Sequence, residues 1–240
     1  MRVALFVPCY VDQFYPQVAI AMLRLLQQLG CTVDVPAGQT CCGQPMANAG
    51  FNSLSGPCFG QFNRVFVGHK IVVVPSGSCV LHLKEHNPAF EGQIYELCEF
   101  LTDVLAIKSL PDSSSSQRGT VRVGLHQSCH GQRGLRLAAM SERNEPAFSK
   151  PETLLRLVEG VELVPLNRAD ECCGFGGTFC VTEEAVSVKM GKDRVADHLR
   201  AGADVITGTD MSCLMHLEGI LRRQGSTVQV KHIAEILYEC

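Results

Sequence analysis

Cys41-Cys42-Gly43 recurs as Cys172-Cys173-Gly174, and this repeated doublet decides how the chain is organised. Each doublet is preceded by a lone cysteine and followed by another, and both of these come after short apolar runs. One cysteine doublet can arise by chance, but two sets of four in the same order indicate a duplicated unit. The first quartet is Cys9, Cys41, Cys42 and Cys79, and the second quartet is Cys129, Cys172, Cys173 and Cys213.

The match between the two copies extends beyond the cysteines. The aligned segments are Ser78-Cys79-Val80-Leu81-His82-Leu83 with Ser212-Cys213-Leu214-Met215-His216-Leu217, and Leu97-Cys98-Glu99-Phe100-Leu101 with Ile233-Ala234-Glu235-Ile236-Leu237. Between the copies lies a polar stretch, with four serines at 113–116, that cannot build a core. We therefore predict a first cysteine-rich repeat at 1–112, a linker at 113–119 and a second cysteine-rich repeat at 120–240.

Short β-branched runs alternate with helical segments in both copies. Strands are predicted at 3–8, 32–35, 71–75, 121–125, 161–164 and 204–207, and helices at 15–30, near 58–68, at 152–159 and at 183–201. This alternation predicts an α/β fold, here two tandem Rossmann-like parallel-sheet repeats related by a pseudo-twofold axis. Ligands of such sheets bind beyond the carboxyl ends of the strands. We therefore expect the cysteines of each quartet to converge at one sheet edge.

The composition is that of a globular protein, with 46% hydrophobic and 19% charged residues. The longest apolar stretches fall short of the roughly 20 residues that span a bilayer, so we expect no membrane span. A net charge of −3 gives no electrostatic basis for binding nucleic acid. No charged region precedes a long apolar segment near Met1, so we expect no signal peptide and a cytoplasmic location.

The 13 cysteines point to metal chemistry. In a reducing cytosol, clustered cysteines bind metals or carry out redox reactions more often than they form disulfides, and thiolates select zinc, copper(I) or iron–sulfur clusters. Adjacent thiolates such as Cys41 and Cys42 fit one tetrahedral ion poorly, whereas a cluster offers each its own iron. We expect an iron–sulfur cluster in each quartet, with zinc as the alternative. The cysteines outside the repeat pattern that we assign to packing are Cys31, Cys58, Cys98 and Cys240.

Other side chains near the quartets are weaker candidates. His82 and His216 each come three residues after a quartet cysteine, where an imidazole can contact a cluster sulfur or a backbone carbonyl, or serve structure alone. The residues without a counterpart in the first copy are His126 and His130, which flank Cys129, and the spare thiol Cys180. The glycine-rich stretch at 174–177 departs from the dinucleotide fingerprint because Phe179 holds its last position. We therefore expect no nicotinamide or flavin site.

These motifs resemble the CCG-type cysteine-rich domain family, which includes the cysteine-rich subunit of heterodisulfide reductase and the iron–sulfur subunit of glycolate oxidase. The resemblance covers essentially the whole chain, and it is strongest to the lactate utilisation protein A branch. The phrases that carry it are Cys41-Cys42-Gly43-Gln44-Pro45, Pro75-Ser76-Gly77-Ser78-Cys79, Cys172-Cys173-Gly174-Phe175-Gly176-Gly177 and Ser212-Cys213-Leu214-Met215-His216. The resemblance implies an electron-transferring subunit of a complex that oxidises L-lactate, a 2-hydroxy acid, to pyruvate.

Two features refine what the resemblance implies. The family motif ends in C-x-x-C, but the first of these cysteines is Ser76 in one copy and Asp210 in the other. Four thiolates per copy then suit a [4Fe–4S] cluster, or a cluster with one oxygen ligand. No ferredoxin-type cysteine run is present in the sequence, so the implied partners are a ferredoxin-type iron–sulfur subunit and a third subunit. The alternative is a zinc- or thiol-based relative of the heterodisulfide reductase subunit that acts on disulfides or serves as a regulatory module.

Overall fold

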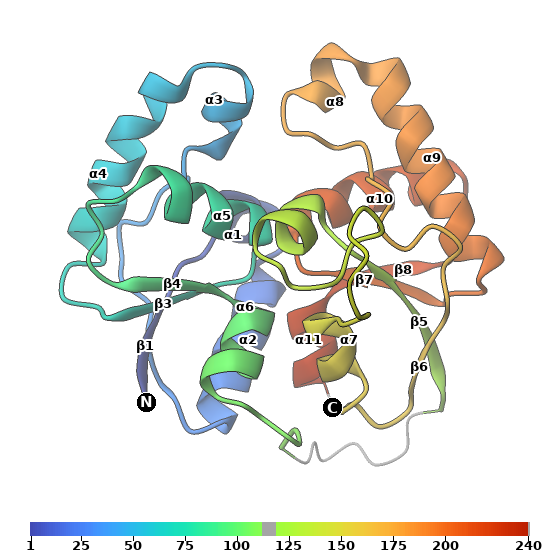
Figure 1. Cartoon of the computed structure of the whole chain (residues 1–240), viewed down its shortest axis with the longest axis horizontal. Coiled ribbons are helices and arrows are strands. Elements are labelled where there is room, and N and C mark those ends of the chain that lie inside the picture. The colour runs from blue at the N-terminus through green and yellow to red at the C-terminus, as the bar shows by residue number, and fades with distance from the viewer. Residues whose placement is uncertain (112–118, 240) are drawn as a thin grey trace.

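The fold comes from a computed structural model that describes residues 1–111 and 119–239. These ranges are called the first half and the second half below. Nearly all of the predicted linker, and Cys240, lie outside the described residues, so the repeat boundaries at 112 and 120 stay predictions. Figure 1 shows the two halves side by side, with both chain ends on the same side of the molecule.

Each half is built on a four-stranded sheet in which all neighbouring strands are parallel. The strands are β1 (Arg2–Leu5), β2 (Thr32–Asp34), β3 (Ile71–Val74) and β4 (Gln93–Glu96) in the first half, and β5 (Val121–His126), β6 (Val161–Leu163), β7 (Val205–Gly208) and β8 (Gln229–His232) in the second. Their orders are β2-β1-β3-β4 and β6-β5-β7-β8. This matching order confirms the predicted α/β fold of two tandem Rossmann-like repeats.

Helices connect and cover these strands (Figure 1). In the first half they are α1 (Cys9–Phe14), α2 (Pro16–Gln28), α3 (Gln44–Asn48), the 3-10 turn η1 (Asn52–Ser55), α4 (Gly56–Val65), α5 (Gly77–His86), α6 (Leu97–Glu99) and the π-helical turn η2 (Phe100–Val104). In the second half they are the π-helical turn η3 (His130–Gly134), α7 (Lys150–Leu155), α8 (Phe179–Thr182), α9 (Glu184–Arg200), α10 (Met211–Arg223) and α11 (Ile233–Tyr238).

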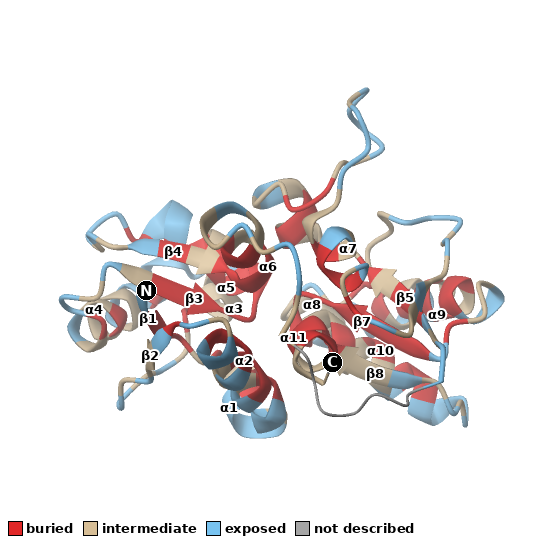
Figure 2. Cartoon of the chain, turned by 90° about the horizontal axis from the view of Figure 1, so that it is seen from below, coloured by how far each residue is buried: buried red, intermediate tan, exposed pale blue. Residues whose placement is uncertain are grey.

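The main core joins the two halves. Apolar residues of α2 recur at helical spacing, and Val18, Met22 and Leu25 are completely buried. The short helix α11 packs against α2, so a helix of the second half covers a helix of the first. One continuous cluster of buried apolar residues therefore includes both helices, β1, β5 and β7. Figure 2 shows that burial is concentrated in the strands and in the helix sides that face them.

Two contacts that cross between the halves are related by the repeat. The ring of Tyr10 lies 6.0 Å from the ring of Phe175, and at the equivalent places Gln44 Nε2 lies 3.2 Å from His130 Nε2. Between these two contacts, Ser76 and Asp210 form an isolated antiparallel bridge. This reciprocal pattern is what a pseudo-twofold axis through the bridge produces.

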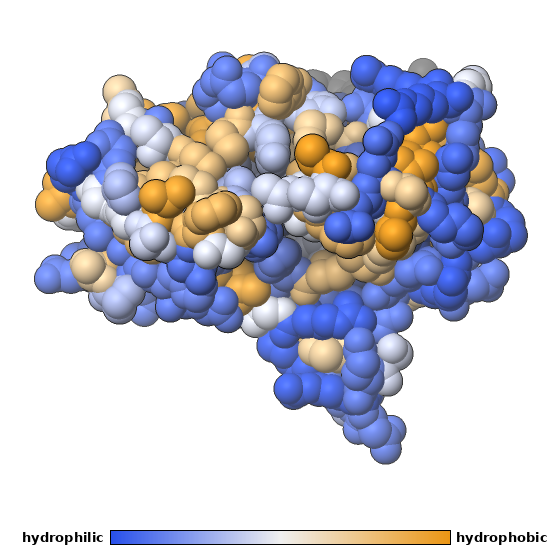
Figure 3. All heavy atoms as spheres, turned by 90° about the horizontal axis from the view of Figure 1, so that it is seen from above, coloured by the Kyte–Doolittle hydropathy of each residue, from blue (hydrophilic) through white to orange (hydrophobic). Residues whose placement is uncertain are grey.

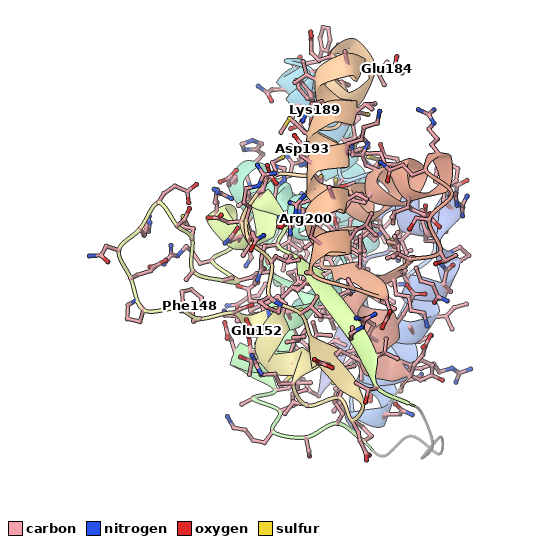
Figure 4. The ribbon with its side chains drawn as sticks, turned by 90° about the vertical axis from the view of Figure 1, so that its right-hand side faces the viewer. Phe148, Glu152, Glu184, Lys189, Asp193 and Arg200 are labelled. Carbon is pink, nitrogen blue, oxygen red and sulfur yellow. The ribbon has the colours of Figure 1, made fainter. Side chains whose placement is uncertain are left out.

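The outer surface of the second half carries charged side chains. Helix α9 runs along this side from Glu184 to Arg200, with Lys189 and Asp193 paired one turn apart (Figure 4). A loop ending near Phe148 projects from the body in the same view. Surface ion pairs of this kind add little to the stability of a protein. The sheets and the shared core, rather than these pairs, therefore hold the loops that carry the cysteines.

A buried carboxyl at the end of β4 makes the stability of the fold sensitive to pH. Glu96 begins α6 and accepts hydrogen bonds from the backbone N–H groups of Cys98 and Glu99. Burial raises the pKa of Glu96 to about 8. Because this pKa is above the unfolded value, the fold favours the protonated form, and the associated stability is lost as pH rises from about 4.5 through about 8.

The variant Glu96→Gln keeps the capping oxygen but cannot ionise. We expect the free energy of unfolding of the parent, relative to the variant, to fall on the order of 3 kcal/mol between pH 5 and pH 8. Urea unfolding of both reduced proteins at several pH values measures this difference. Parallel pH profiles for the two proteins would show that Glu96 does not titrate in this range.

Candidate metal centres

The first quartet lies beyond the carboxyl ends of β1, β2 and β3. Cys9 begins α1, just after β1, while the doublet at 41–42 sits in the loop after β2 and Cys79 lies in the first turn of α5. Cys9 Sγ lies 3.7 Å from Cys41 Sγ, and Cys42 Sγ lies 3.2 Å from Cys79 Sγ. The crevice where strand order reverses, between β1 and β3, is the usual ligand site of such sheets. The structure thus brings together all four predicted cysteines.

Gly43 lets the doublet loop turn tightly around its own sulfur. Its φ of 94° is in the left-handed region, and a Cβ there would lie 3.0 Å from the Cβ of Ser55. The backbone N–H of Gly43 points at Cys41 Sγ, at 3.4 Å. Amides aimed at sulfur stabilise a thiolate and tune the potential of an iron–sulfur cluster. Gly43 therefore allows the tight turn and donates its backbone N–H to the sulfur of Cys41.

The thiols of the first quartet differ in their pKa values. Hydrogen bonds from Cys42 and Cys9, together with the Gly43 amide, lower the pKa of Cys41. The hydrogen bond with Cys41, joined for Cys42 by a hydrogen bond with Cys79 and followed in both by burial, raises the pKa values of Cys9 and Cys42. Cys41 is therefore the thiolate around which the others are arranged. A bound metal group would take the place of the shared protons.

The second quartet repeats this arrangement beyond β5, β6 and β7. Hydrogen bonds from Cys129 and Cys173 lower the pKa of Cys172, as those of Cys9 and Cys42 do for Cys41. The backbone N–H of Gly174 lies 3.3 Å from Cys172 Sγ, and that of Phe175 lies 3.5 Å from Cys173 Sγ. A hydrogen bond also links Cys173 to Cys213. The second set of four predicted cysteines therefore also meets in one place.

An imidazole lies beside the second quartet. A ring nitrogen of His126 and the sulfurs of Cys173 and Cys213 lie within 4.8 Å of one another. The His126 side chain is buried, and burial followed by the charge of Arg194 lowers its pKa to about 3. In the sequence, His126 stands out only as a residue beside Cys129 without a counterpart in the first copy. Its position three residues before a quartet cysteine is the signal that could have assigned it to this site.

A pocket at the boundary between the halves contains the first quartet. Its lining from the first half includes the four cysteines, and its lining from the second half includes Phe175, Asp210 and Ser212. The carboxylate of Asp210 accepts hydrogen bonds from the backbone N–H of Ser78, at 2.8 Å, and from Ser212. In this structure the carboxylate therefore links the first turns of α5 and α10. The hydroxyl of Ser76 instead accepts a hydrogen bond from the backbone N–H of Cys79, at 3.3 Å.

The remaining cysteines lie apart from these thiol contacts. Cys31 and Cys98 are buried in the main core. Cys180 donates to the backbone oxygen of Gly177 rather than joining the second quartet, and the half-buried Cys58 has its pKa raised mainly by burial. All the described cysteines are free thiols.

The paired histidines differ in their contacts. His216 Nε2 lies 3.3 Å from the backbone oxygen of Ser187, so its contact is with a backbone carbonyl, one of the contacts predicted for it. His82 stacks near the rings of Phe59 and His86. Its Nε2 is buried without a hydrogen-bond partner among the described residues. Burial, with His86 second, lowers the pKa of His82 to about 4.

The donor sets fit a metal ion or an iron–sulfur group. Each quartet offers four soft sulfur ligands in contact with one another, and backbone amides point at the sulfurs of each doublet. The four cysteines of each quartet come from separate loops at the carboxyl edge of their sheet, so their sulfurs gather at that edge. Fold and sites together define a duplicated α/β protein with two equivalent cysteine clusters whose donor sets suit a metal group.

Comparison with known proteins places the chain in a family. The sequence profile of the CCG family, "Cysteine-rich domain", matches residues 3–84 and 123–218, and the chain belongs to this family. It is 40% identical to "Lactate utilization protein A" of Geobacillus kaustophilus (strain HTA426), over 99% of this chain and 98% of that protein. It is 38% identical to the protein of the same name from Geobacillus sp. (strain WCH70), over 99% of both chains.

Structural comparison adds evidence on the fold alone. A hypothetical protein from Helicobacter pylori resembles this chain with a TM-score of 0.58 and 10% sequence identity, over 98% of this chain and 48% of that one. Within the described ranges, no helix has the length and apolar character needed to cross a bilayer.

Proposed function

We propose that the chain is an iron–sulfur, electron-transferring subunit of a complex that oxidises L-lactate to pyruvate in the cytoplasm. The observation that carries the proposal is the convergence of four thiols in each of two equivalent sites. The full-length similarity to proteins named for lactate utilisation supports lactate as the substrate. The eight quartet cysteines would hold the clusters, most simply one [4Fe–4S] cluster in each quartet.

The chain's own residues have a supporting part in this function. When bound, iron–sulfur clusters accept and release single electrons, whereas lactate oxidation releases two electrons and two protons. The amides of Gly43 and Gly174 would stabilise the anionic sulfurs. The pocket that contains the first quartet is lined by residues of both halves. Because the shared core packs the two halves together, it also fixes the geometry of this pocket.

Partner subunits would supply what this chain lacks. The sequence contains no ferredoxin-type cysteine run to carry electrons onward, which supports a ferredoxin-type iron–sulfur partner and a third subunit. Figure 3 shows apolar residues over both halves on the face where α3 and α8 lie. Exposed apolar side chains near these elements include Phe51, Leu54 and Val181. Such a face suits a protein partner.

The proposal predicts a coloured protein that depends on its partners. Purified without oxygen, the chain should contain iron and sulfide in equal amounts and absorb broadly in the visible range. Alone, it should not oxidise lactate with an artificial electron acceptor, and activity should appear when the partner subunits are added. Anaerobic metal and sulfide analysis, followed by a lactate-dependent dye reduction assay, measures both results.

The outcomes separate the alternatives. Colourless protein that retains stoichiometric zinc through reconstitution with iron and sulfide would favour the zinc- or thiol-based protein. Lactate oxidation by the isolated chain would contradict the role of an electron-transferring subunit. If the protein contains iron but does not support lactate oxidation with its partners, the assignment of iron–sulfur clusters stands and the assignment of lactate as the substrate is wrong.

A further inference from the structure

The two halves differ at three equivalent positions close to the quartets. Phe6 and His126 each lie three residues before the first cysteine of their quartet. Ser55 and Ser187 each lie against the glycine of their doublet. Counting seven and eleven residues onward from these serines gives two further pairs. The three pairs are Phe6 with His126, Phe62 with Arg194, and Phe66 with His198.

In the first half these positions form an aromatic cluster. The ring of Phe6 lies 5.3 Å from that of Phe62 and 5.9 Å from that of Phe66, in edge-to-face geometry. Cys42 and Cys79 belong to the same buried apolar cluster. At these three positions, the side chains that pack behind the first quartet are therefore all apolar, as is usual in a packed core.

In the second half the same positions are polar and equally buried. Arg194 Nε donates to His198 Nε2 at 3.2 Å, and the guanidinium of Arg194 lies 3.5 Å from the carboxylate of Asp197. The glycine at position 124 provides the room, since a Cβ there would lie 2.3 Å from His198 Nδ1. The first half has Ala4 at the matching place on β1. Three buried polar side chains in place of three phenylalanines are costly unless they have partners or a function.

His126 is the member of this group that faces the sulfurs. Both of its ring nitrogens are buried and without a hydrogen-bond partner among the residues that the structure describes. One ring nitrogen lies within 4.8 Å of the sulfurs of Cys173 and Cys213. Buried ring nitrogens normally have a partner, so this pair of orphan atoms points to a group that is bound there.

We propose that His126 is a nitrogen ligand of the second metal site in place of one of its four thiolates, which makes this site a mixed thiolate–imidazole centre while the first is bound by thiolates alone. The inference rests on the proposed function only in placing a metal group at the second quartet. A neutral imidazole is a common metal ligand beside thiolates. Metal–sulfur bonds of about 2.3 Å and metal–nitrogen bonds of about 2.0–2.1 Å place ligand atoms roughly 3.5–3.8 Å apart, so the observed spacing needs only a small closure.

The charge of Arg194 behind His126 would keep its imidazole neutral and able to bind a metal. Arg194 is completely buried, and its Nη2 is also without a partner in the described parts of the chain. The charge of Arg194 acts on both His126 and the sulfur of Cys173. A guanidinium at this depth attracts the anionic sulfurs and disfavours a second positive charge on the imidazole. Phenylalanine at the equivalent place, Phe62, can do neither.

Cobalt(II) alone is the probe, because it replaces zinc or iron at such sites and reports its ligands spectroscopically. The full chain is purified metal-free, kept reduced, loaded with cobalt(II) and labelled with ¹⁵N-histidine. Electron–nuclear double resonance should show a large coupling from a directly bound histidine nitrogen. The coupling should disappear in His126→Phe, which copies the residue of the first half, and cobalt should bind the second site at least about tenfold more weakly.

The matched control is His82→Phe, which removes the buried imidazole that lies near the first quartet. This variant should keep the histidine coupling and the cobalt affinity of the parent. Absence of the coupling from the unsubstituted chain would overturn the proposal, whether or not His126→Phe folds. Coupling that survives in His126→Phe would overturn it equally. Neither result depends on iron or lactate oxidation, so failure of this proposal is distinct from failure of the proposed function.

Discussion

Replacing Cys172 by serine is expected to remove about half of the iron from anaerobically purified protein, because one of the two clusters is lost. Cys172 lies between two partners, accepting hydrogen bonds from the thiols of Cys129 and Cys173. Its lowered pKa marks it as the central thiolate of the second quartet. A serine hydroxyl at this place is a harder and much weaker ligand than a thiolate. Iron and sulfide analysis, with visible absorption, measures the loss.

Two further variants test whether the effect belongs to the quartets. Cys41→Ser should remove the other half of the iron, because Cys41 has the equivalent place in the first quartet. Cys31→Ser should leave the iron content unchanged, since Cys31 lies in the main core. Lactate oxidation by the assembled complex should fail with either quartet variant. Full iron content in Cys172→Ser would contradict the ligand assignment.

Replacing Asp210 by alanine is expected to cost on the order of 3 kcal/mol in the free energy of unfolding. The buried carboxylate accepts hydrogen bonds from the backbone N–H groups of Ser78 and Ser212 and from the hydroxyl of Ser212. Hydrogen bonds to a charged group are stronger than neutral ones, and alanine leaves the buried Ser78 amide unpaired. Urea unfolding of the reduced, metal-free protein measures the loss.

The matched control for Asp210→Ala is Ser76→Ala, at the equivalent position of the first half. Ser76 caps only its own helix, through the amide of Cys79, so its removal should cost about 1 kcal/mol. Equal losses from the two variants would show that the contact of Asp210 with the first half contributes nothing. A larger loss from Asp210→Ala would support its role as a link between the halves.

Much of the fold follows from local patterns. The repeated doublets predict two equivalent units, and the β-branched run at 71–74 predicts the central strand β3. Helix α2 was predicted at 15–30 and spans Pro16–Gln28. The edge strands β4 and β8 were not predicted. Each has polar residues at both ends and only four residues, so its sequence resembles a loop, and its pairing comes from the neighbouring strand.

The candidate sites were predicted in part. The eight quartet cysteines meet in two places because each lies in a segment that follows a parallel strand. This order of strand and cysteine can be read from the sequence. The link made by Asp210 could not be predicted, since it depends on α5 and α10 meeting across the halves. The group of His126, Arg194 and His198 was also missed. Its members lie on β5 and α9, about 70 residues apart, and each alone resembles an ordinary core or surface residue.

The contact between α2 and α11 has a consequence for synthesis of the chain. On the ribosome, α11 is made on the order of 200 residues after α2, which at typical rates is roughly 10–40 s later. During that interval the side of α2 that α11 covers stays open to water and to other nascent chains. The first sheet can form early, but its apolar surface is complete only when the last helix arrives. Chaperones that hold exposed apolar helices should therefore engage this protein during translation and release it after α11 has emerged.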